Sequence, residues 1–190
     1  MVLAASEPVI LCDDIIPAAV NAPLRSYADA ISGGFSYRGK PCSILVAWGK
    51  VIYGAACHAH IGKPESVLYR LTDGYIGIRR VKTASELPKN VKWAVGGAGL
   101  LDMYAPKQEG FAAQYADVLR RTSHTFTGTH GDKIVLGYVK SMTAEEVNAY
   151  VKRMGLDHAI MLDGGHVAAI NSAATKINTT ATQHSIIQGV

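Results

Sequence analysis

The sequence has few charged residues and few aromatic residues, and it lacks any long apolar run. Charged residues make up 18% of the chain and aromatic residues 7%, whereas 48% are hydrophobic. A disordered chain has the opposite balance, so this composition predicts a globular protein. No apolar run approaches the ~20 residues that a membrane-spanning helix needs, so no membrane span is predicted.

Concentrated positive charge is also missing. The formal net charge is only +4, and the basic pairs at 79–80, 120–121 and 152–153 are scattered along the chain. Domains that bind nucleic acids gather such residues on one face, so no nucleic-acid partner is predicted. The charge indicates only a weak preference for anionic ligands.

The N-terminus carries no recognisable targeting signal. The segment MVLAASEPVILCDD lacks a basic region followed by a long apolar core, so no signal peptide is predicted. We therefore expect a chain that is cytoplasmic as synthesised, either phage-associated or released to act at the cell surface.

The cysteines form no close-spaced pattern. Cys12, Cys42 and Cys57 include no Cys-x-x-Cys pair, which disfavours a metal site or a catalytic thiol. We interpret them as free thiols in a reducing compartment, with one disulfide and one spare thiol as the alternative.

Helical patterns are few. A helix is predicted over residues 143–154, where Thr143 and Glu146 form a capping box and Gly155 ends the helix. Two more helices are predicted, over residues 109–121 and, after Pro23, over residues 24–30.

Strand and hairpin patterns dominate the rest of the chain. Hairpins are predicted over residues 43–54, 68–81 and 124–139, and residues 158–165 read as a buried strand that runs into a glycine turn. The length of 190 residues suits one domain, and no linker or repeat divides it. The expected fold is therefore a single α+β domain, residues 1–190, with a mostly antiparallel or mixed sheet and a few packed helices.

Three segments combine paired glycines with polar residues at the ends of strands: 30–41, 93–102 and 161–167. A glycine pair lets the backbone turn sharply, approach a ligand closely and present amide donors. Each segment alone is typical of an ordinary turn. Three of them in one small domain, with Arg121 and several histidines in between, indicate a ligand site.

The order of these motifs resembles the phosphodiester glycosidase family over about residues 27–190. The matching features are Ser-Gly-Gly-Phe, a Gly-Lys hairpin, Val-Gly-Gly, Arg-Thr-Ser, a Gly-Asp-Lys hairpin, a capped helix and Leu-Asp-Gly-Gly. The family includes the enzyme that uncovers mannose 6-phosphate by removing N-acetylglucosamine, and bacterial and phage relatives. The resemblance implies that the chain has the fold of this family. It also implies a hydrolase that acts on a glycosyl 1-phosphodiester or a related cell-surface glycan.

The resemblance also assigns roles to individual residues: Asp163 is the expected catalytic carboxylate and Arg121 the expected phosphate clamp. His166 directly follows Asp-Gly-Gly, so its own chemistry makes it a candidate acid or base near neutral pH. The ordinary alternatives are an Asp163 that caps a glycine turn, a surface Arg121 and a structural His166. The residues expected to bind substrate are Ser32, Gly33, Gly34, Gly97, Thr122, Ser123, Gly164 and Gly165. Six of these residues are expected to converge on one cleft: Asp163, Arg121, Gly33, Gly34, Gly97 and His166.

The chain departs from the family pattern at three positions. Ser32, His166 and Val167 stand where the family has asparagine, glycine and serine. Because these positions are expected to contact substrate, the resemblance supports the fold more strongly than the activity. A non-catalytic carbohydrate-binding module is therefore an alternative. A phage-type cell-wall glycan hydrolase is a further alternative.

The remaining histidines suggest no metal site. His124, His130 and His184 are interpreted as structural, and a zinc site made of His124, His130 and Asp163 has no familiar ligand spacing. No metal is therefore predicted. The sequence does not specify a cofactor, the sugar or the oligomeric state.

Overall fold

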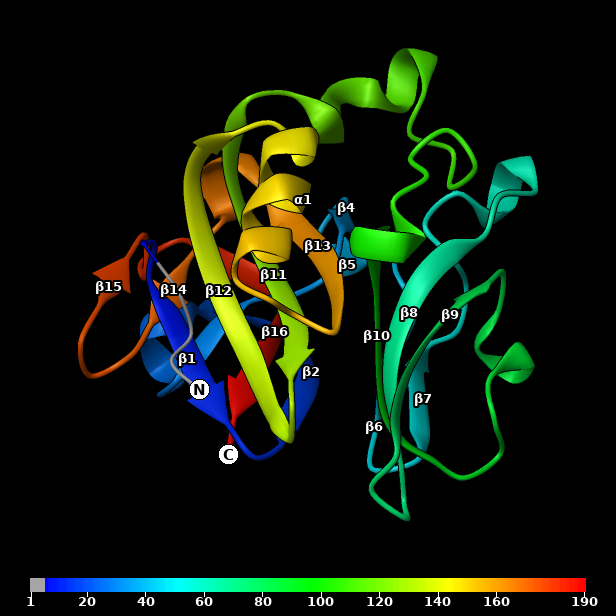
Figure 1. Ribbon diagram of the computed structural model, residues 1–190, viewed down its shortest axis with the longest axis horizontal. Coiled ribbons are helices and arrows are strands. Elements are labelled where there is room, and N and C mark those ends of the chain that lie inside the picture. Colours follow the sequence, from blue (N-terminus) through cyan, green and yellow to red (C-terminus); the bar gives the residue numbers. More distant parts are fainter. Residues whose placement is uncertain (1–5) are drawn as a thin grey trace.

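The computed structural model describes residues 6–190, in which two main sheets and one α-helix pack together (Figure 1). Residues 1–5, where the segment assessed for a signal peptide begins, lie outside the described residues. No helix within residues 6–190 has the length and apolar character needed to cross a membrane.

The larger sheet has nine strands, and its strands pair in antiparallel fashion. Its main path runs through β1 (Val9–Cys12), β12 (Lys133–Met142), β11 (Thr122–His130), β13 (His158–Gly164), β10 (Val91–Gly99), β6 (Leu45–Ala47) and β7 (Lys50–Tyr53). A branch leaves this path at β10, which also pairs with β8 (Glu65–Leu71), and β8 in turn pairs with β9 (Ile76–Val81).

The smaller sheet has five strands, in the order β15 (Lys176–Ile177), β14 (Ile170–Asn171), β3 (Ala30–Ser32), β16 (Thr182–Gly189) and β2 (Ile15–Pro23). A separate two-stranded hairpin consists of β4 (Ser36–Tyr37) and β5 (Lys40–Pro41). The helices are α1 (Ala144–Arg153) and the short 3-10 segments η1 (Leu24–Ser26), η2 (Ala59–Ile61), η3 (Ala84–Glu86), η4 (Leu101–Met103), η5 (Ala113–Leu119) and η6 (Gly165–Val167).

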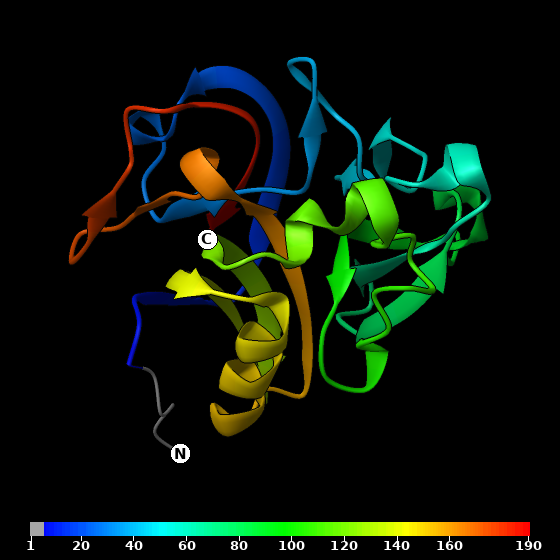
Figure 2. The same cartoon turned by 90° about the horizontal axis from the view of Figure 1, so that it is seen from above.

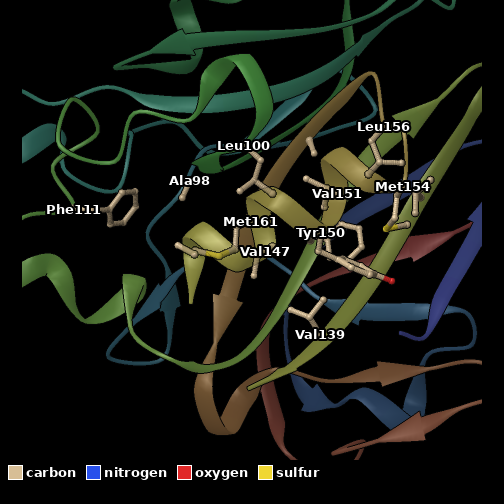
Figure 3. Packing of buried hydrophobic residues seen from close by; sticks show 14 of the residues in the cluster. Ala98, Leu100, Phe111, Val139, Val147, Tyr150, Val151, Met154, Leu156 and Met161 are labelled. Atoms are coloured by element: carbon tan, nitrogen blue, oxygen red, sulfur yellow. The ribbon is translucent and has the colours of Figure 1, made fainter. Parts of the chain in front are cut away.

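β13 is buried on both faces, because α1 covers one face of the larger sheet and the smaller sheet covers the other. Successive side chains of a strand point to opposite faces. Met161 therefore packs with Val147 and Val151 of α1 (Figure 3), whereas Ile160 and Leu162 belong to a second cluster with residues of the smaller sheet. This double covering explains the continuous apolar run of the strand.

The fold class and the clearest local predictions are confirmed. The protein is α+β with antiparallel pairing, and the hairpins β6–β7, β8–β9 and β11–β12 form as predicted. Helix α1 has Thr143 as its N-cap, the Thr143–Glu146 capping box is present, and Gly155 follows with a φ of 74°. Each of these features depends on residues close together in sequence.

The helix predicted over residues 109–121 is wrong, because the chain there forms only the 3-10 segment η5. The first residues of this segment make contacts that an α-helix would not allow. The carboxylate of Glu109 accepts hydrogen bonds from Ser66 Oγ (2.5 Å) and Gly99 N (2.9 Å), and Gly110 has a φ of 89°. Phe111 is buried, so an α-helix beginning at Glu109 would remove these groups from their partners.

The helix predicted over residues 24–30 is also wrong, since only the single turn η1 forms. Asn171 Nδ2 donates to Tyr27 O at 2.6 Å and so occupies a carbonyl that a longer helix would use. Asp29 then adopts a φ of 46°, which breaks the helical path.

The pairing of Gly137 with Phe126 gives a test of the packing between α1 and the larger sheet. The two residues lie opposite each other on β12 and β11, and an added Cβ at Gly137 would overlap the fully buried Phe126 ring. We expect Gly137→Ala to lower the free energy of unfolding by about 1–3 kcal/mol, measured by urea denaturation.

A double-mutant cycle provides the control. If ring overlap is the cause, Gly137→Ala should cost clearly less in a Phe126→Leu background. Strictly additive costs would contradict the explanation.

Candidate active site

Asp163 lies one residue before the end of β13, where the strand leaves the core. Its Oδ2 accepts a hydrogen bond from Ser36 Oγ at 3.0 Å, and its Oδ1 accepts one from Gly164 N at 2.8 Å. Its own backbone N–H donates to Gly33 O at 3.1 Å. The carboxylate is therefore held by the β4–β5 hairpin and by its own strand end.

Burial raises the pKa of Asp163 above its ordinary value of 3.8, because the carboxylate loses contact with water. The hydrogen bonds from Gly164 and Ser36, and the charge of His166, act in the opposite direction without cancelling the effect. Asp163 thus binds a proton more readily than an exposed aspartate does. Shifts of this kind are common among catalytic carboxylates.

A narrow hollow lies beside this carboxylate, with about 190 Å³ of space between the atoms when the open solvent at its mouth is included. Its walls come from the end of β3, the β4–β5 hairpin, the end of β13, η6 and the first half of β16. The lining residues are Ser32, Gly33, Gly34, Ser36, Asp163, Val167, Thr182, Gln183, His184 and Ser185. Typical ligand pockets enclose ~300–1,000 Å³, whereas this hollow leaves no room inside it even for a water molecule, so a ligand would sit at its mouth or require it to widen.

Ser32 forms the floor of the hollow and is only 1% exposed. Its Oγ accepts a hydrogen bond from Ala169 N at 3.1 Å and lies 3.2 Å from Thr125 Oγ1. The Thr125 hydroxyl also lies within 3.0 Å of Ser32 O and 3.2 Å of Asp163 O. These contacts join the two sheets, and the substrate-binding role of Ser32 stays a prediction.

The glycines allow strands to approach one another closely. Gly33 N donates to Ser185 O at 2.9 Å, and Gly164 N donates to the carboxylate of Asp163, so neither amide is free for a ligand. Gly97 lies in β10, outside the lining of the hollow, and an added Cβ there would overlap the carbonyl of Met161. Close packing of the chain explains these three glycines, and their contacts with substrate stay predictions.

Three histidines surround the end of β13 in different ways. His166 is exposed on η6, and its charge is close enough to favour the ionised form of Asp163. His124 is buried beside Gly164, and burial lowers its pKa. His184, which was interpreted as structural from the sequence, lines the hollow and approaches Gly39 of the hairpin.

Arg121 does not point into the hollow. Its guanidinium donates to Ser141 O at 2.7 Å and pairs with Glu146, on a separate surface depression. The preceding residue, Arg120, lies closer to the site: its Nη2 is 3.8 Å from the position that a Cβ on Gly165 would occupy. The clamp role of Arg121 stays a prediction, and Arg120 is a candidate that the motif did not reveal.

The other two residues of the arginine motif, Thr122 and Ser123, also differ in how close they lie to the site. Thr122 Oγ1 lies 4.0 Å from the Cβ position of Gly165, on the side of the glycine turn. Ser123 Oγ instead accepts a hydrogen bond from Tyr138 Oη at 2.8 Å, away from the lining of the hollow. Thr122 is thus better placed than Ser123 to reach a ligand.

Within residues 6–190, no group of three His, Cys, Asp or Glu side chains is arranged to hold a metal ion. His130 lies at the opposite end of β11, where its Nδ1 is 2.9 Å from Gly155 O.

Comparison with known proteins now decides the family. The sequence profile described as "Phosphodiester glycosidase" matches residues 18–186. The chain belongs to the phosphodiester glycosidase family. No matching sequence is found among curated proteins.

Solved structures support the family fold. The zebrafish N-acetylglucosamine-1-phosphodiester alpha-N-acetylglucosaminidase catalytic domain, auto-inhibited by its pro-peptide, superposes with a TM-score of 0.68 at 12% identity. The match covers 94% of this chain and 72% of that one.

Two bacterial structures are similar as well. A hypothetical protein from Synechocystis has a TM-score of 0.63 at 11% identity, covering 94% of this chain but only 56% of that protein. A protein of Burkholderia pseudomallei described as a candidate exported protein has a TM-score of 0.61 at 12% identity, with coverages of 97% and 71%.

This phosphodiester glycosidase domain also buries a carboxylate that the sequence did not single out. Glu65 is 1% exposed, and its side chain accepts hydrogen bonds from Ile44 N (2.5 Å) and Cys57 N (3.1 Å). Burial raises the pKa of Glu65 to about 8. Its side chain fills the space beside Gly96, which explains that glycine.

The raised pKa of Glu65 predicts how stability depends on pH. In the unfolded chain Glu65 has its ordinary pKa of 4.5, so above pH 4.5 only the folded protein keeps the proton. The free energy of unfolding therefore falls as the pH rises toward about 8. Between about pH 6.5 and 8 we expect Glu65 to contribute a loss of at most about 1.4 kcal/mol per pH unit, measured by urea unfolding. Asp163 and Glu109, whose pKa burial also raises, act in the same direction. Below 6.5, His58 and His124 act in the opposite sense, because burial lowers their pKa.

Glu65→Gln is the matched variant, since it removes the titration while keeping the size of the side chain. Its absolute stability will differ, but its unfolding free energy should change less with pH across this window. An unchanged pH slope would show that another group is responsible.

Proposed function

We propose that the protein hydrolyses a glycosyl 1-phosphodiester or a related cell-surface glycan, with Asp163 as the catalytic carboxylate. The observation that carries this proposal is the Asp163 carboxylate itself, which lines a hollow, is fixed by Ser36 and Gly164, and has a raised pKa. Membership of the phosphodiester glycosidase family supports the reaction class.

The chemistry fits a site with a single carboxylate. Ordinary glycosidases use two carboxyl groups, one of which protonates the leaving oxygen. A phosphate leaves as a stable anion and needs little protonation, so one carboxylate suffices to activate water or to attack the anomeric carbon. Within residues 6–190, Asp163 is the one carboxylate among the residues that line the hollow.

An arginine at the start of β11 would bind the phosphate. The motif points to Arg121, whereas the geometry favours Arg120, which lies beside Gly165 and is not paired with Glu146. A planar guanidinium can hold two phosphate oxygens at once. His166, exposed next to the glycine turn, is a further candidate acid or base.

A carbohydrate-binding module without turnover is the second candidate. It is favoured by the small volume of the hollow and by Ser32, whose hydroxyl is buried in contacts within the chain. The two functions differ in one observable, the release of sugar.

The direct test is Asp163→Asn with a panel of synthetic glycosyl 1-phosphodiesters and wall polymers. We expect the variant to lose at least ~100-fold in rate of sugar release, as typical for a missing base or nucleophile. Its thermal unfolding should stay close to wild type, because neutralising a carboxylate that burial already disfavours costs little.

Asp157→Asn is the matched control, because Asp157 is exposed beyond the opposite end of β13 and caps Gly131 N (2.8 Å). It should leave the rate unchanged. A folded Asp163→Asn variant with native turnover would overturn the assignment, and saturable binding without release of sugar by the wild type would favour the module.

The two arginines can be separated by paired substitutions. Arg120→Lys should lower kcat/KM for a phosphodiester by about tenfold or more, because lysine keeps the charge and loses the planar fork. Arg121→Lys should have a much smaller effect on steady-state kinetics. A larger loss of kcat/KM in Arg121→Lys would assign the phosphate to Arg121. If neither variant changed kcat/KM, the proposal of an arginine that binds the phosphate would be wrong.

A further inference from the structure

Cys42 and Cys57 lie next to each other although 14 residues separate them in the sequence. Their Sγ atoms are 3.7 Å apart, close enough for one thiol to donate to the other. Both residues are partly exposed and not enclosed in the core. A disulfide needs its sulfurs at about 2.05 Å, so the two side chains must turn toward each other for the bond to form.

Hydrogen bonds fix the two backbone segments that carry these thiols. The buried carboxylate of Glu65 accepts from Cys57 N with one oxygen and from Ile44 N, two residues after Cys42, with the other. Cys42 N in turn donates to Phe35 O at 2.9 Å. The thiols are thus held in place by groups other than themselves.

The third cysteine is remote from this pair. Cys12 packs against a different core cluster, and its Sγ donates to Ile134 O at 3.7 Å. Burial raises its pKa to about 11, which keeps the thiol protonated. The three thiols therefore divide into one facing pair and one isolated group.

We infer that Cys42 and Cys57 are a dithiol site that glutathione disulfide, or another small disulfide, converts to an intramolecular disulfide in the folded protein. The thiolate of Cys42 attacks one sulfur of the small disulfide and releases the first thiol. The sulfur of Cys57, after losing its proton to solvent, attacks the mixed disulfide at Cys42 and releases the second. Two protein thiols are oxidised, and one small disulfide is reduced to two thiols.

The order of attack follows from the environment of each sulfur. The hydrogen bond with Cys42 and burial both raise the pKa of Cys57, so Cys57 is the poorer first nucleophile. Once Cys42 is in a mixed disulfide, the neighbouring Cys57 is the group placed to resolve it.

The new bond would brace the β4–β5 hairpin. Cys42 directly follows β5, and the same hairpin carries Ser36, whose hydroxyl holds Asp163. The bond also closes a loop of about 16 residues, which restricts the unfolded chain. We expect the oxidised protein to have a Tm about 6–12 °C above that of the reduced protein.

The experiment uses the full chain, reduced, freed of reductant and then incubated folded with glutathione disulfide. Free thiols titrated after denaturation should fall from three to one, the mass should fall by two hydrogens, and peptide mapping should find Cys42 joined to Cys57. Cys12→Ser should lose both of its remaining thiols and keep the Tm shift.

Cys57→Ser is the matched negative control, because it leaves Cys42 without its resolving partner. It should form no internal bond, gain glutathione at most, and show no comparable rise in Tm. Three thiols surviving in the folded wild type, a bond that includes Cys12, or glutathione left on both Cys42 and Cys57 would each overturn the inference.

Discussion

The hydrogen bonds around Thr125 are the interaction on which the arrangement of the candidate site depends. One hydroxyl on β11 reaches the carbonyls of Ser32 on β3 and of Asp163 on β13. It thereby joins the central strand of the smaller sheet to a central strand of the larger one. Because these groups are buried, loss of one partner would leave the others unsatisfied, at a cost of about 1–3 kcal/mol for each group.

As a consequence, the carboxylate of Asp163 is positioned by residues near the N-terminus of the chain. The extended backbone of Gly33 accepts from Asp163 N, and Ser36 then turns back to the carboxylate. The glycines serve this arrangement chiefly as positions without side chains. In Figure 2, seen from above, the turn that follows β13 lies near the start of β11, which brings Arg120 beside Gly165.

The features that could be predicted from the sequence are those set by residues close together in the chain. The capping box of α1, the three hairpins and the buried strand β13 all follow from spacing within a few residues. The prediction failed over residues 109–121, because the preference of Glu109 for partners on β8 and β10 outweighs local helical periodicity. Such long-range contacts leave no local pattern in the sequence.

The same limit applies to the candidate site. Asp163 and Gly34 could be named from their motifs, but Ser36 and His184 could not, since only the folded chain brings them to one hollow. Near Arg120 and Arg121, the pairing of β11 with β12 has an irregularity between Thr122 and His124. A bulge of this kind changes which side chains face a given side, and the sequence alone does not reveal it.

Any ligand that entered the hollow would have to displace one of its walls, because the hollow has no free space inside it. One of these walls is the β4–β5 hairpin, a two-stranded sheet with few hydrogen bonds of its own. If the binding-competent form is the widened one, the apparent dissociation constant rises as the population of that form falls. Association would then be governed by how often the hairpin opens, and a compound that fills the widened form would leave slowly.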